Sequence, residues 1–239
     1  MGYAKTTSRI DSLNRTKTLN ESLAAAWLSF FHRRDNSMNN DSNDLLYEAA
    51  LVWKDLMQFY YILTYGYKKH LYTINLFFPP EKFPHLAGFH YLKDINLPRF
   101  NPSKTLDMIL KRKINYSQIQ KSSQFERSIK PRLEAIVRLK QTLEQDFTLY
   151  SYLPRYYSFH TQIQADYLIS SAASPVDFVF IIKSNPSEDL SFCDFVCCSA
   201  FTQNTRDYRE NQRARTLLKK ERVHIFTKES VTLFDRLNN

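Results

Sequence analysis

Two histidines five residues apart are the first candidates for chemistry in this chain. His85 and His90 stand in the segment Phe83–Tyr91. Histidine titrates near neutral pH, so either side chain can take up or release a proton during a reaction. Residues five apart on a helix are separated by about 140°, so we expect only one of the two to face a given site. The alternative interpretation is a half-buried histidine that bonds to the backbone.

No metal-ligand motif accompanies these histidines in the sequence. There is no H-E-x-x-H, no carboxylate pair at helical spacing and no acidic cluster suited to magnesium. Cleavage of RNA requires less, because its 2′-hydroxyl supplies the nucleophile. The protein then needs a base, an acid for the leaving 5′-oxygen and cations for the charged phosphorane. Histidine, tyrosine, lysine and arginine can fill these roles, and we expect no cofactor.

The chain carries an excess of positive charge that is concentrated in two segments. Its 239 residues include 33 Lys and Arg against 24 Asp and Glu, which gives a formal net charge of +9. The excess falls within residues 93–140 and 206–228. Such a distribution predicts a partner rich in phosphate or carboxylate. Ordinary solvated helices are the alternative.

Glycine is scarce, and this excludes several nucleotide-binding motifs. Gly2, Gly66 and Gly88 stand alone, so there is no G-x-G-x-x-G fingerprint and no G-x-x-x-x-G-K-[ST] loop. The chain also contains 18 Phe and 15 Tyr. We therefore expect side chains rather than backbone amides to hold any bound phosphate, with aromatic rings available to stack on unpaired bases.

The cysteines predict buried thiols rather than a disulfide framework or a zinc site. Cys193, Cys197 and Cys198 are odd in number and lie within one strand-like segment without a C-x-x-C spacing. A zinc site would also need His160 or His224. The sequence has no run of 18 apolar residues, so we expect no membrane span and a cytoplasmic location.

Composition divides the chain into two parts. Residues 1–43 form a polar N-terminal extension that we expect to be flexible or, over residues 8–34, an amphipathic helix. Residues 44–239 have the pattern of a packed domain. A helix is predicted from Asp44 by apolar residues at helical spacing, and a hairpin by period-two alternation over 59–65 and 71–78.

Further helices and strands are predicted downstream. Helices are expected from Glu81, over 104–113 with Ser103 as N-cap, after a capping box at Ser123, and from Pro131 to Gln145. Strands are expected over 147–152, 164–171, 176–183 and 194–201, followed by a basic helix over 207–221 and a closing hairpin. Helices followed by an antiparallel sheet predict an α+β fold.

The segment Phe83–Ile95, with the letters F-P-H-L-A-G-F-H-Y-L-K-D-I, resembles the phage barnase/EndoU/colicin/RelE-like nuclease domains. The resemblance extends to residues 114–122, 129–132, 164–167, 179–182, 198–201 and 207–212, and covers about 45–226. It implies N-terminal helices packed on an antiparallel sheet of about four strands, the BECR-like fold. It also implies a metal-independent ribonuclease, often a toxin or effector. Ala200 departs from the pattern, which has an aromatic residue there.

The candidate site residues follow from this resemblance and from residue chemistry. His85 is the first choice for acid or base, with His90 as the alternative. Arg132 and Lys183 are candidates to neutralise the phosphorane, and Tyr208 is a further catalytic candidate. The substrate-binding candidates are Ser122, which could instead cap a helix, and Ser199, Thr202, Gln212, Arg209 and Arg213.

These observations predict a metal-independent endoribonuclease that acts on single-stranded regions of tRNA or mRNA. The resemblance implies a toxin or effector of a phage or mobile element, with an antitoxin or immunity protein as a second partner. One alternative is a catalytically inactive module of a mobile element that binds nucleic acid or protein. Another is a DNA-associated accessory protein of phage or plasmid replication.

Overall fold

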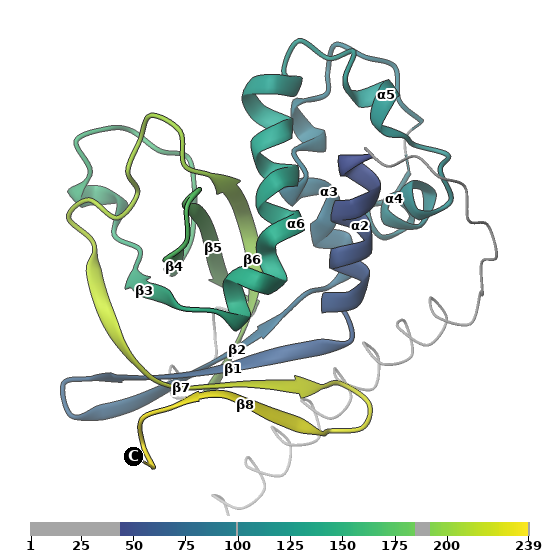
Figure 1. Ribbon diagram of the computed structural model, residues 1–239. Helices are drawn as coiled ribbons and strands as arrows, with labels where there is room; N and C mark the ends of the chain where they lie inside the picture. The colour runs from purple at the N-terminus through teal and green to yellow at the C-terminus, as the bar shows by residue number, and fades with distance from the viewer. Residues whose placement is uncertain (1–43, 99, 185–191, 239) are drawn as a thin grey trace, which may run out of the picture. The chain divides into compact units, whose positions relative to one another are not determined.

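The computed structural model describes residues 44–98, 100–184 and 192–238 (Figure 1). The expected N-terminal extension, residues 1–43, lies outside the described residues, as does the side chain of Cys193. Cys197 is buried and Cys198 is partly buried, and both are free thiols. None of the helices in the described ranges combines the length and apolar character needed to cross a lipid bilayer.

The first described helix confirms the prediction from helical spacing. Helix α2, Leu45–Leu56, begins where the side chain of Asp44 accepts a hydrogen bond of 2.8 Å from the amide of Tyr47. This bond satisfies an amide that has no partner inside the helix. The apolar face is buried, and the Trp53 ring meets that of Phe78 edge to face at 5.6 Å. The helix is therefore held by its apolar face as well as by its cap.

The predicted hairpin is present. Strands β1, Phe59–Tyr67, and β2, His70–Phe77, pair antiparallel through a two-residue turn at Lys68 and Lys69. A stretch of short helices and one long helix follows. They are η1 Pro80–Lys82, α3 Phe83–Leu86, η2 Phe89–Tyr91, α4 Pro102–Leu110, α5 Tyr116–Ile119, the π-helix η3 Phe125–Ile129, α6 Lys130–Glu144 and, further along the chain, η4 Pro154–Tyr156.

The caps of these helices differ from those predicted. Asn101 caps α4 in place of Ser103, and the capping box joins Asn115 and Gln118 rather than starting at Ser123. Both asparagines accept a backbone amide bond from the residue three positions later, which is the geometry that Ser, Thr, Asp and Asn all favour. Pro131 does lie in the first turn of α6 as expected.

The second half of the chain forms strands, including one where a helix was predicted. The strands are β3 Phe147–Ser151, β4 Tyr167–Ser171, β5 Asp177–Lys183, β6 Phe192–Thr202, β7 Arg213–His224 and β8 Ser230–Asp235. The prediction of a basic helix over 207–221 is wrong, because most of that segment is β7. This strand pairs with β1, β3 and β8, and such non-local pairing overrides local propensity.

The predicted fold class is also wrong, because the sheet closes on itself. Its strand order is β1-β2-β6-β5-β4-β3-β7-β8, and β1 also pairs with β7. Seven strands thus form a closed mixed barrel with β8 added outside the ring, rather than an antiparallel sheet of about four strands under N-terminal helices. The pairing of β2 with β6 is parallel, and the other pairings are antiparallel. Pairing of β1 with β7 joins distant parts of the chain and removes two exposed sheet edges.

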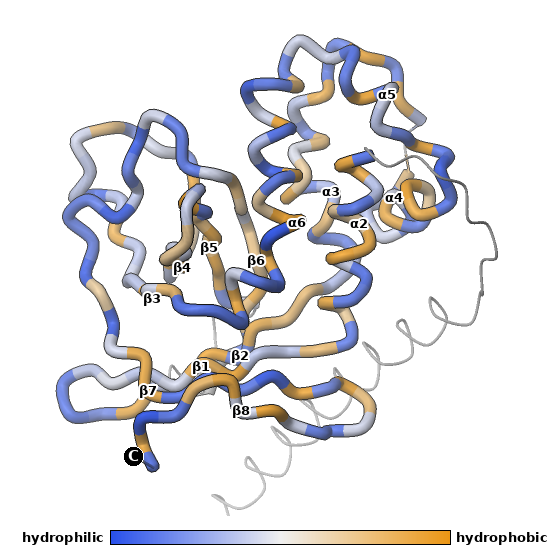
Figure 2. Tube along the Cα trace, viewed as in Figure 1, coloured by the Kyte–Doolittle hydropathy of each residue, from blue (hydrophilic) through white to orange (hydrophobic). Residues whose placement is uncertain are grey.

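The strands β4, β5 and β6 position the site because they are covered on both faces. One face carries an aromatic cluster that includes Tyr152, Phe180 and Tyr208. On the opposite face Arg138 of α6 donates two hydrogen bonds of 2.8 Å to Asp177 and one of 2.7 Å to Thr202. Figure 2 shows hydrophobic residues running along these strands and hydrophilic ones along the exposed turns. These bonds fix α6 against the sheet at the point where β5 begins and β6 ends.

Candidate active site

His85 and His90 are brought together by a break in the helix that was expected to separate them. Helix α3 ends at Leu86, and the chain turns back at Gly88 with a φ of 82° before η2 begins. The two imidazole rings consequently stack, with centroids 4.5 Å apart and planes 16° apart. The expected separation of the two side chains by about 140° is therefore wrong. It assumed a continuous helix through Gly88.

Gly88 is needed for two reasons, its backbone conformation and its closeness to α6. A φ of 82° lies in the left-handed region that side chains disfavour. A β-carbon at this position would lie 3.0 Å from Arg132 Cδ and 3.0 Å from Ile129 Cδ1. The Arg132 side chain thus packs directly on the backbone that carries the two histidines.

Arg132 joins this turn to the barrel. Its guanidinium donates a hydrogen bond of 3.1 Å to Ser199 Oγ on β6 and one of 3.4 Å to the Tyr91 hydroxyl. The Tyr91 ring in turn lies 4.0 Å from that of His90, between centroids. Hydroxyl groups therefore hold the guanidinium and leave its positive charge uncompensated by these contacts.

The electrostatic surroundings keep both histidines neutral. Loss of hydration lowers the pKa of His85, and the positive charges of Arg132 and Lys82 lower it further. The pKa of His90 is lowered to about 4, mainly by loss of hydration and then by His85 and Arg132. Each imidazole therefore has a free ring nitrogen at neutral pH that can accept a proton.

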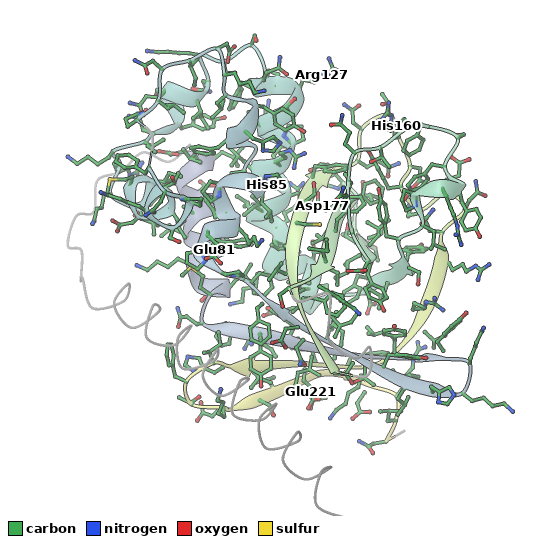
Figure 3. The ribbon with its side chains drawn as sticks, turned by 180° about the vertical axis from the view of Figure 1, so that it is seen from behind. Glu81, His85, Arg127, His160, Asp177 and Glu221 are labelled. Atoms are coloured by element: carbon green, nitrogen blue, oxygen red, sulfur yellow. The ribbon has the colours of Figure 1, made fainter. Side chains whose placement is uncertain are left out.

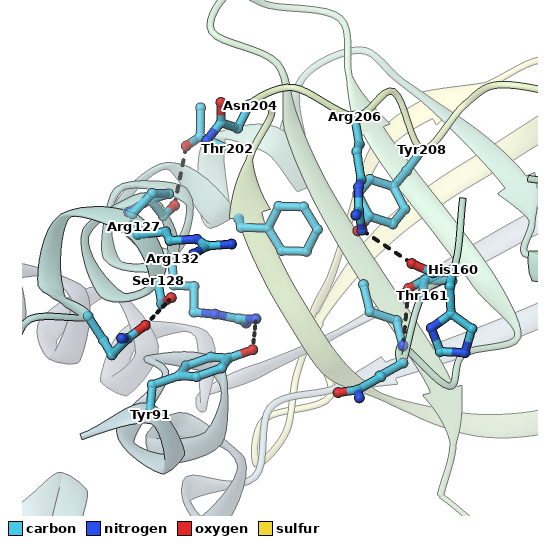
Figure 4. A pocket seen from close by; sticks show the side chains of 15 residues that line it. Tyr91, Arg127, Ser128, Arg132, His160, Thr161, Thr202, Asn204, Arg206 and Tyr208 are labelled. Carbon is cyan, nitrogen blue, oxygen red and sulfur yellow. Dashed lines mark hydrogen bonds between the residues drawn. The ribbon is translucent and has the colours of Figure 1, made fainter. Parts of the chain in front are cut away.

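Arg132 lines a pocket of about 620 Å³ whose walls also carry the positively charged side chains of Arg127 and Arg206 (Figure 4). Arg127, Ser128, Arg132 and Tyr91 lie on one side, and His160 and Thr161 lie on the opposite side with Arg206 and Tyr208. Figure 3 shows Arg127 and His160 approaching this opening from the helical part and from the strand part of the molecule. Among the described residues that line the pocket, none is Asp or Glu.

Arg132 and Arg206 in the pocket have neutral rather than acidic partners. Arg206 donates a hydrogen bond of 3.2 Å to the carbonyl of His160 and lies 4.9 Å from the centre of the Phe159 ring. The ion pairs found within the described ranges include neither Arg127, Arg132 nor Arg206. Three cations around one opening without a paired carboxylate form a site suited to an anion such as phosphate.

Thr202 and Tyr208 line this pocket, although other contacts engage both of them. Thr202 Oγ1 donates to Asp177 at 2.9 Å and accepts a bond of 2.7 Å from Arg138. Tyr208 is 8% exposed within the aromatic cluster. With His85, His90, Arg132 and Ser199, they make six sequence-predicted residues that lie in or beside the pocket.

Two of the other candidates have structural contacts. Ser122 donates a hydrogen bond of 2.7 Å to Asp94, and together with Ser123 it lowers the pKa of that carboxyl to about 2. Gln212 accepts a bond from the amide of Leu153 at 2.6 Å and donates one to its carbonyl at 3.2 Å. These bonds join segments that are far apart in the sequence, Ser122 to Asp94 and Gln212 to Leu153.

The remaining basic candidates do not line the pocket. Arg209 is neutralised by Asp207, to which it donates two bonds of 2.8 Å. Arg213 is exposed at the start of β7. Lys183 ends β5 and is paired with Phe195, four residues before Ser199 on β6, which corresponds to about 13 Å along the strand.

Sequence reasoning missed several residues around the pocket, namely Tyr91, Arg127, Ser128, His160 and Arg206. Tyr91 follows His90 directly and lies within the segment Phe83–Ile95 that resembles the family, so its position in the sequence could have identified it. His160 and Arg206 are brought together by tertiary structure, and no local spacing relates them. A search of the described residues for three or more His, Cys, Asp or Glu placed to hold a metal ion found no such group.

Comparison with known proteins gives one match. The family model described as phage-Barnase-EndoU-ColicinE5/D-RelE like nuclease 4 matches residues 45–237. No match was found among curated proteins or among solved structures. The matched range includes all eight strands and every residue of the pocket. The chain therefore belongs to the phage-Barnase-EndoU-ColicinE5/D-RelE like nuclease 4 family, whose activity is that of a nuclease and whose substrate is nucleic acid.

Proposed function

We propose that this protein is a metal-independent endoribonuclease that cleaves single-stranded RNA by attack of its own 2′-hydroxyl. The observation that carries the proposal is the neutral pair His85 and His90 beside Arg132, at a pocket lined by three arginines and, among described residues, by no acid. Such a site offers a proton acceptor and positive charge to a phosphodiester at the same place.

His85 is the proposed general base. A base works best when its pKa lies near the working pH. The pKa of His90 is about 4, which makes that imidazole a weak proton acceptor, whereas the shift of His85 is smaller. His90 then acts by stacking on His85 and orienting its ring.

The proposed reaction is a transfer of the phosphoryl group to the neighbouring oxygen. His85 takes the proton of the 2′-hydroxyl, and the 2′-oxygen forms a bond to the adjacent phosphorus. Arg132 stabilises the negative charge of the phosphorane. The bond from phosphorus to the 5′-oxygen breaks, and that oxygen receives the proton of the Tyr91 hydroxyl. The products are a 2′,3′-cyclic phosphate and a free 5′-hydroxyl.

Single-stranded RNA is the proposed substrate because the pocket combines cations with aromatic rings. Phe201 and Tyr208 line it together with the arginines. Unpaired bases of tRNA or mRNA can stack on aromatic side chains while their phosphates bind arginine. The family description refers to phage, colicin and RelE-like nucleases, which supports a cytoplasmic toxin or effector of a phage or mobile element, with an antitoxin or immunity protein as partner.

The first prediction concerns this activity. Full-length protein incubated with total RNA in EDTA should yield fragments that end in 2′,3′-cyclic phosphate, detected by mapping of the RNA ends. His85→Ala should lower the rate about 100-fold or more, since it removes the base. Arg132→Ala should have an effect of similar size, because it removes charge stabilisation. Lys113→Ala, an exposed lysine outside the pocket, is the matched control.

Two outcomes would contradict the proposal. Cleavage that EDTA abolishes and magnesium restores would show that the reaction depends on a metal. Intact RNA that the protein retains on a filter in a salt-sensitive manner would instead support the alternative, a binding module without catalytic activity.

A further inference from the structure

The turn between β1 and β2 presents two lysines in an unusual backbone conformation. Lys68 has a φ of 49° and Lys69 a φ of 65°, so both central residues of this two-residue turn are left-handed. Turns of this kind favour Asn-Gly, because other side chains are strained there. Both lysines are exposed. The turn therefore displays two positive charges where the backbone alone would favour different residues.

Further positive charge lies directly beside this turn. The guanidinium carbon of Arg215 on β7 lies 3.8 Å from the centre of the Tyr67 ring, and Lys68 Nζ lies 5.3 Å from it. A hydrogen bond from Arg215 lowers the pKa of the Tyr67 hydroxyl, with a smaller contribution from Lys68. Arg215 Nε also donates a bond of 2.7 Å to Ser151 Oγ. The arginine is thus held in place next to the lysines.

Acidic side chains do not neutralise these cations within the described part of the chain. Lys68, Lys69, Arg213 and Arg215 take part in none of its ion pairs. The far end of the same strand differs, because Lys219 pairs with Glu221 and Arg222 with Glu144. Toward the start of β7 and at the neighbouring turn, by contrast, the positive charges have no acidic partner among the described residues.

The position of this surface relative to the pocket limits what it can bind. Tyr208 lines the pocket, and Arg215 follows it by seven residues. Seven residues span at most about 25 Å. A stacked nucleic-acid strand that rises about 3.4 Å per nucleotide crosses this distance with about seven nucleotides. One RNA strand can consequently reach both places. Figure 1 shows the β1–β2 turn projecting beyond the point where β7 joins β1.

We propose that the surface formed by Lys68, Lys69, Arg213 and Arg215, here called the lysine-turn surface, binds the phosphate backbone of RNA outside the pocket. The partner is RNA because exposed ammonium groups beside a stacked arginine suit a line of phosphates. This binding goes beyond the proposed ribonuclease activity, since it requires no cleavage. It makes RNA of about eight nucleotides or more the preferred ligand.

The test uses a substitution that removes charge and relieves strain. Lys68→Asn with Lys69→Gly introduces the preferred sequence for this turn, so thermal stability should be equal or higher. The probe is a 20-nucleotide RNA methylated at every 2′-oxygen, which lacks the nucleophile. We expect its affinity for the variant to fall about tenfold at 50 mM salt, and the slope of log K against log salt to fall by about 1.4. Binding of a methylated trinucleotide should not change.

The matched control is Lys228→Gly. Lys228 is also exposed and left-handed, with a φ of 61°, but it lies beside the turn between β7 and β8. Its substitution should leave both affinity and salt slope unchanged. An equal effect of both variants, or no effect of the double variant, would overturn the proposal. Weaker binding of polyglutamate with unchanged RNA binding would also overturn it, in favour of an acidic protein. Because the probe cannot be cleaved, this experiment measures binding alone. Its result does not depend on whether the protein is a ribonuclease.

Discussion

The stacked histidines are the central feature at the level of residues, because their chemistry depends on one another and on Arg132. Their rings lie 4.5 Å apart, and Arg132 lowers the pKa of both. A proton on either ring would stand close to the guanidinium charge. These surroundings therefore keep the imidazoles neutral and place the positive charge on arginine, next to which the proposed reaction forms its phosphorane.

The pH dependence of the activity follows from this arrangement. The proposed base must be neutral, so kcat/KM should fall as pH decreases through the pKa of His85 and be constant above it. Since that pKa is lowered, the midpoint should lie below 6.5. Lys82→Gln removes one of the charges that lower this pKa, so the midpoint should move upward. It is measured as the pH profile of kcat/KM on a synthetic RNA.

The matched control for this profile is Lys121→Gln, an exposed lysine that does not contribute to the pKa of either histidine. Its midpoint should equal that of the unaltered protein. A midpoint above 6.5 in the unaltered protein, or a downward shift in Lys82→Gln, would show that His85 is not the base.

At the level of elements, the junction between α3 and η2 decides the geometry of the site. Four residues of helix, a left-handed glycine and a single 3₁₀ turn place His90 back over His85. Arg132 in the first turn of α6 and Ile129 at the end of η3 pack against that glycine. The positions of His85, the proposed base, and of Arg132, the proposed cation for the phosphorane, are thus both set by this contact at Gly88.

Gly88→Ala tests this contact. The left-handed φ should cost about 1–2 kcal/mol of unfolding free energy, which urea unfolding measures. The β-carbon would also meet Arg132 Cδ at 3.0 Å, so the arginine should shift and kcat/KM should fall more than this loss of stability explains. A variant with normal activity at temperatures where it is fully folded would contradict the role assigned to Gly88.

Gly66→Ala is the control, since it is the same substitution elsewhere in the described chain. Its β-carbon would lie 3.2 Å from Leu218 Cδ1, the end of a flexible side chain, and Gly66 has no left-handed φ. We expect a smaller change in unfolding free energy and unchanged kcat/KM.

Local signals explain which elements were predicted correctly. Apolar spacing found α2 and α6, and alternation found the β1–β2 hairpin. The exact caps were missed because several side chains near each helix start could accept the same amide. The strand β7 was predicted as a helix because its basic residues recur along the chain without a strict alternation. Its conformation is set by β1, β3 and β8.

At the level of the whole molecule, closure of the barrel fixes the pocket wall that contains Arg206 and Tyr208. These residues lie just before β7, which pairs with β3 on one side and β1 on the other. The opposite wall belongs to η3 and α6, and α6 packs against β6. The distance across the pocket therefore depends on the pairing of β1 with β7.

Two proline substitutions compare how much the closed ring of seven strands and the added strand β8 contribute to stability and activity. Ile62 of β1 pairs with both Asn75 of β2 and Glu221 of β7, so Ile62→Pro should lower the unfolding free energy by about 3 kcal/mol or more and abolish activity. Val231 lies on the outer strand β8 and, among the described strands, pairs with Arg222 of β7 alone. Val231→Pro should therefore cost about 1 kcal/mol or less and preserve activity.

Circular dichroism, thermal unfolding and the RNA cleavage rate measure these effects. Equal destabilisation by the two prolines would show that β8 is as essential as the closed ring. Normal stability of the Ile62→Pro variant would show that β1 does not close the barrel.

The sequence by itself determined the family and most helices and strands, and it gave His85, His90 and Arg132 as candidate site residues. These depend on side-chain type and on short-range spacing, which can be read along the chain. Only the tertiary structure decided that the sheet closes, that the histidines stack, and that Arg127, Arg132 and Arg206 surround one pocket. The physical reason is that strand pairing, the left-handed turn at Gly88 and the approach of distant loops are set by contacts between residues far apart in sequence.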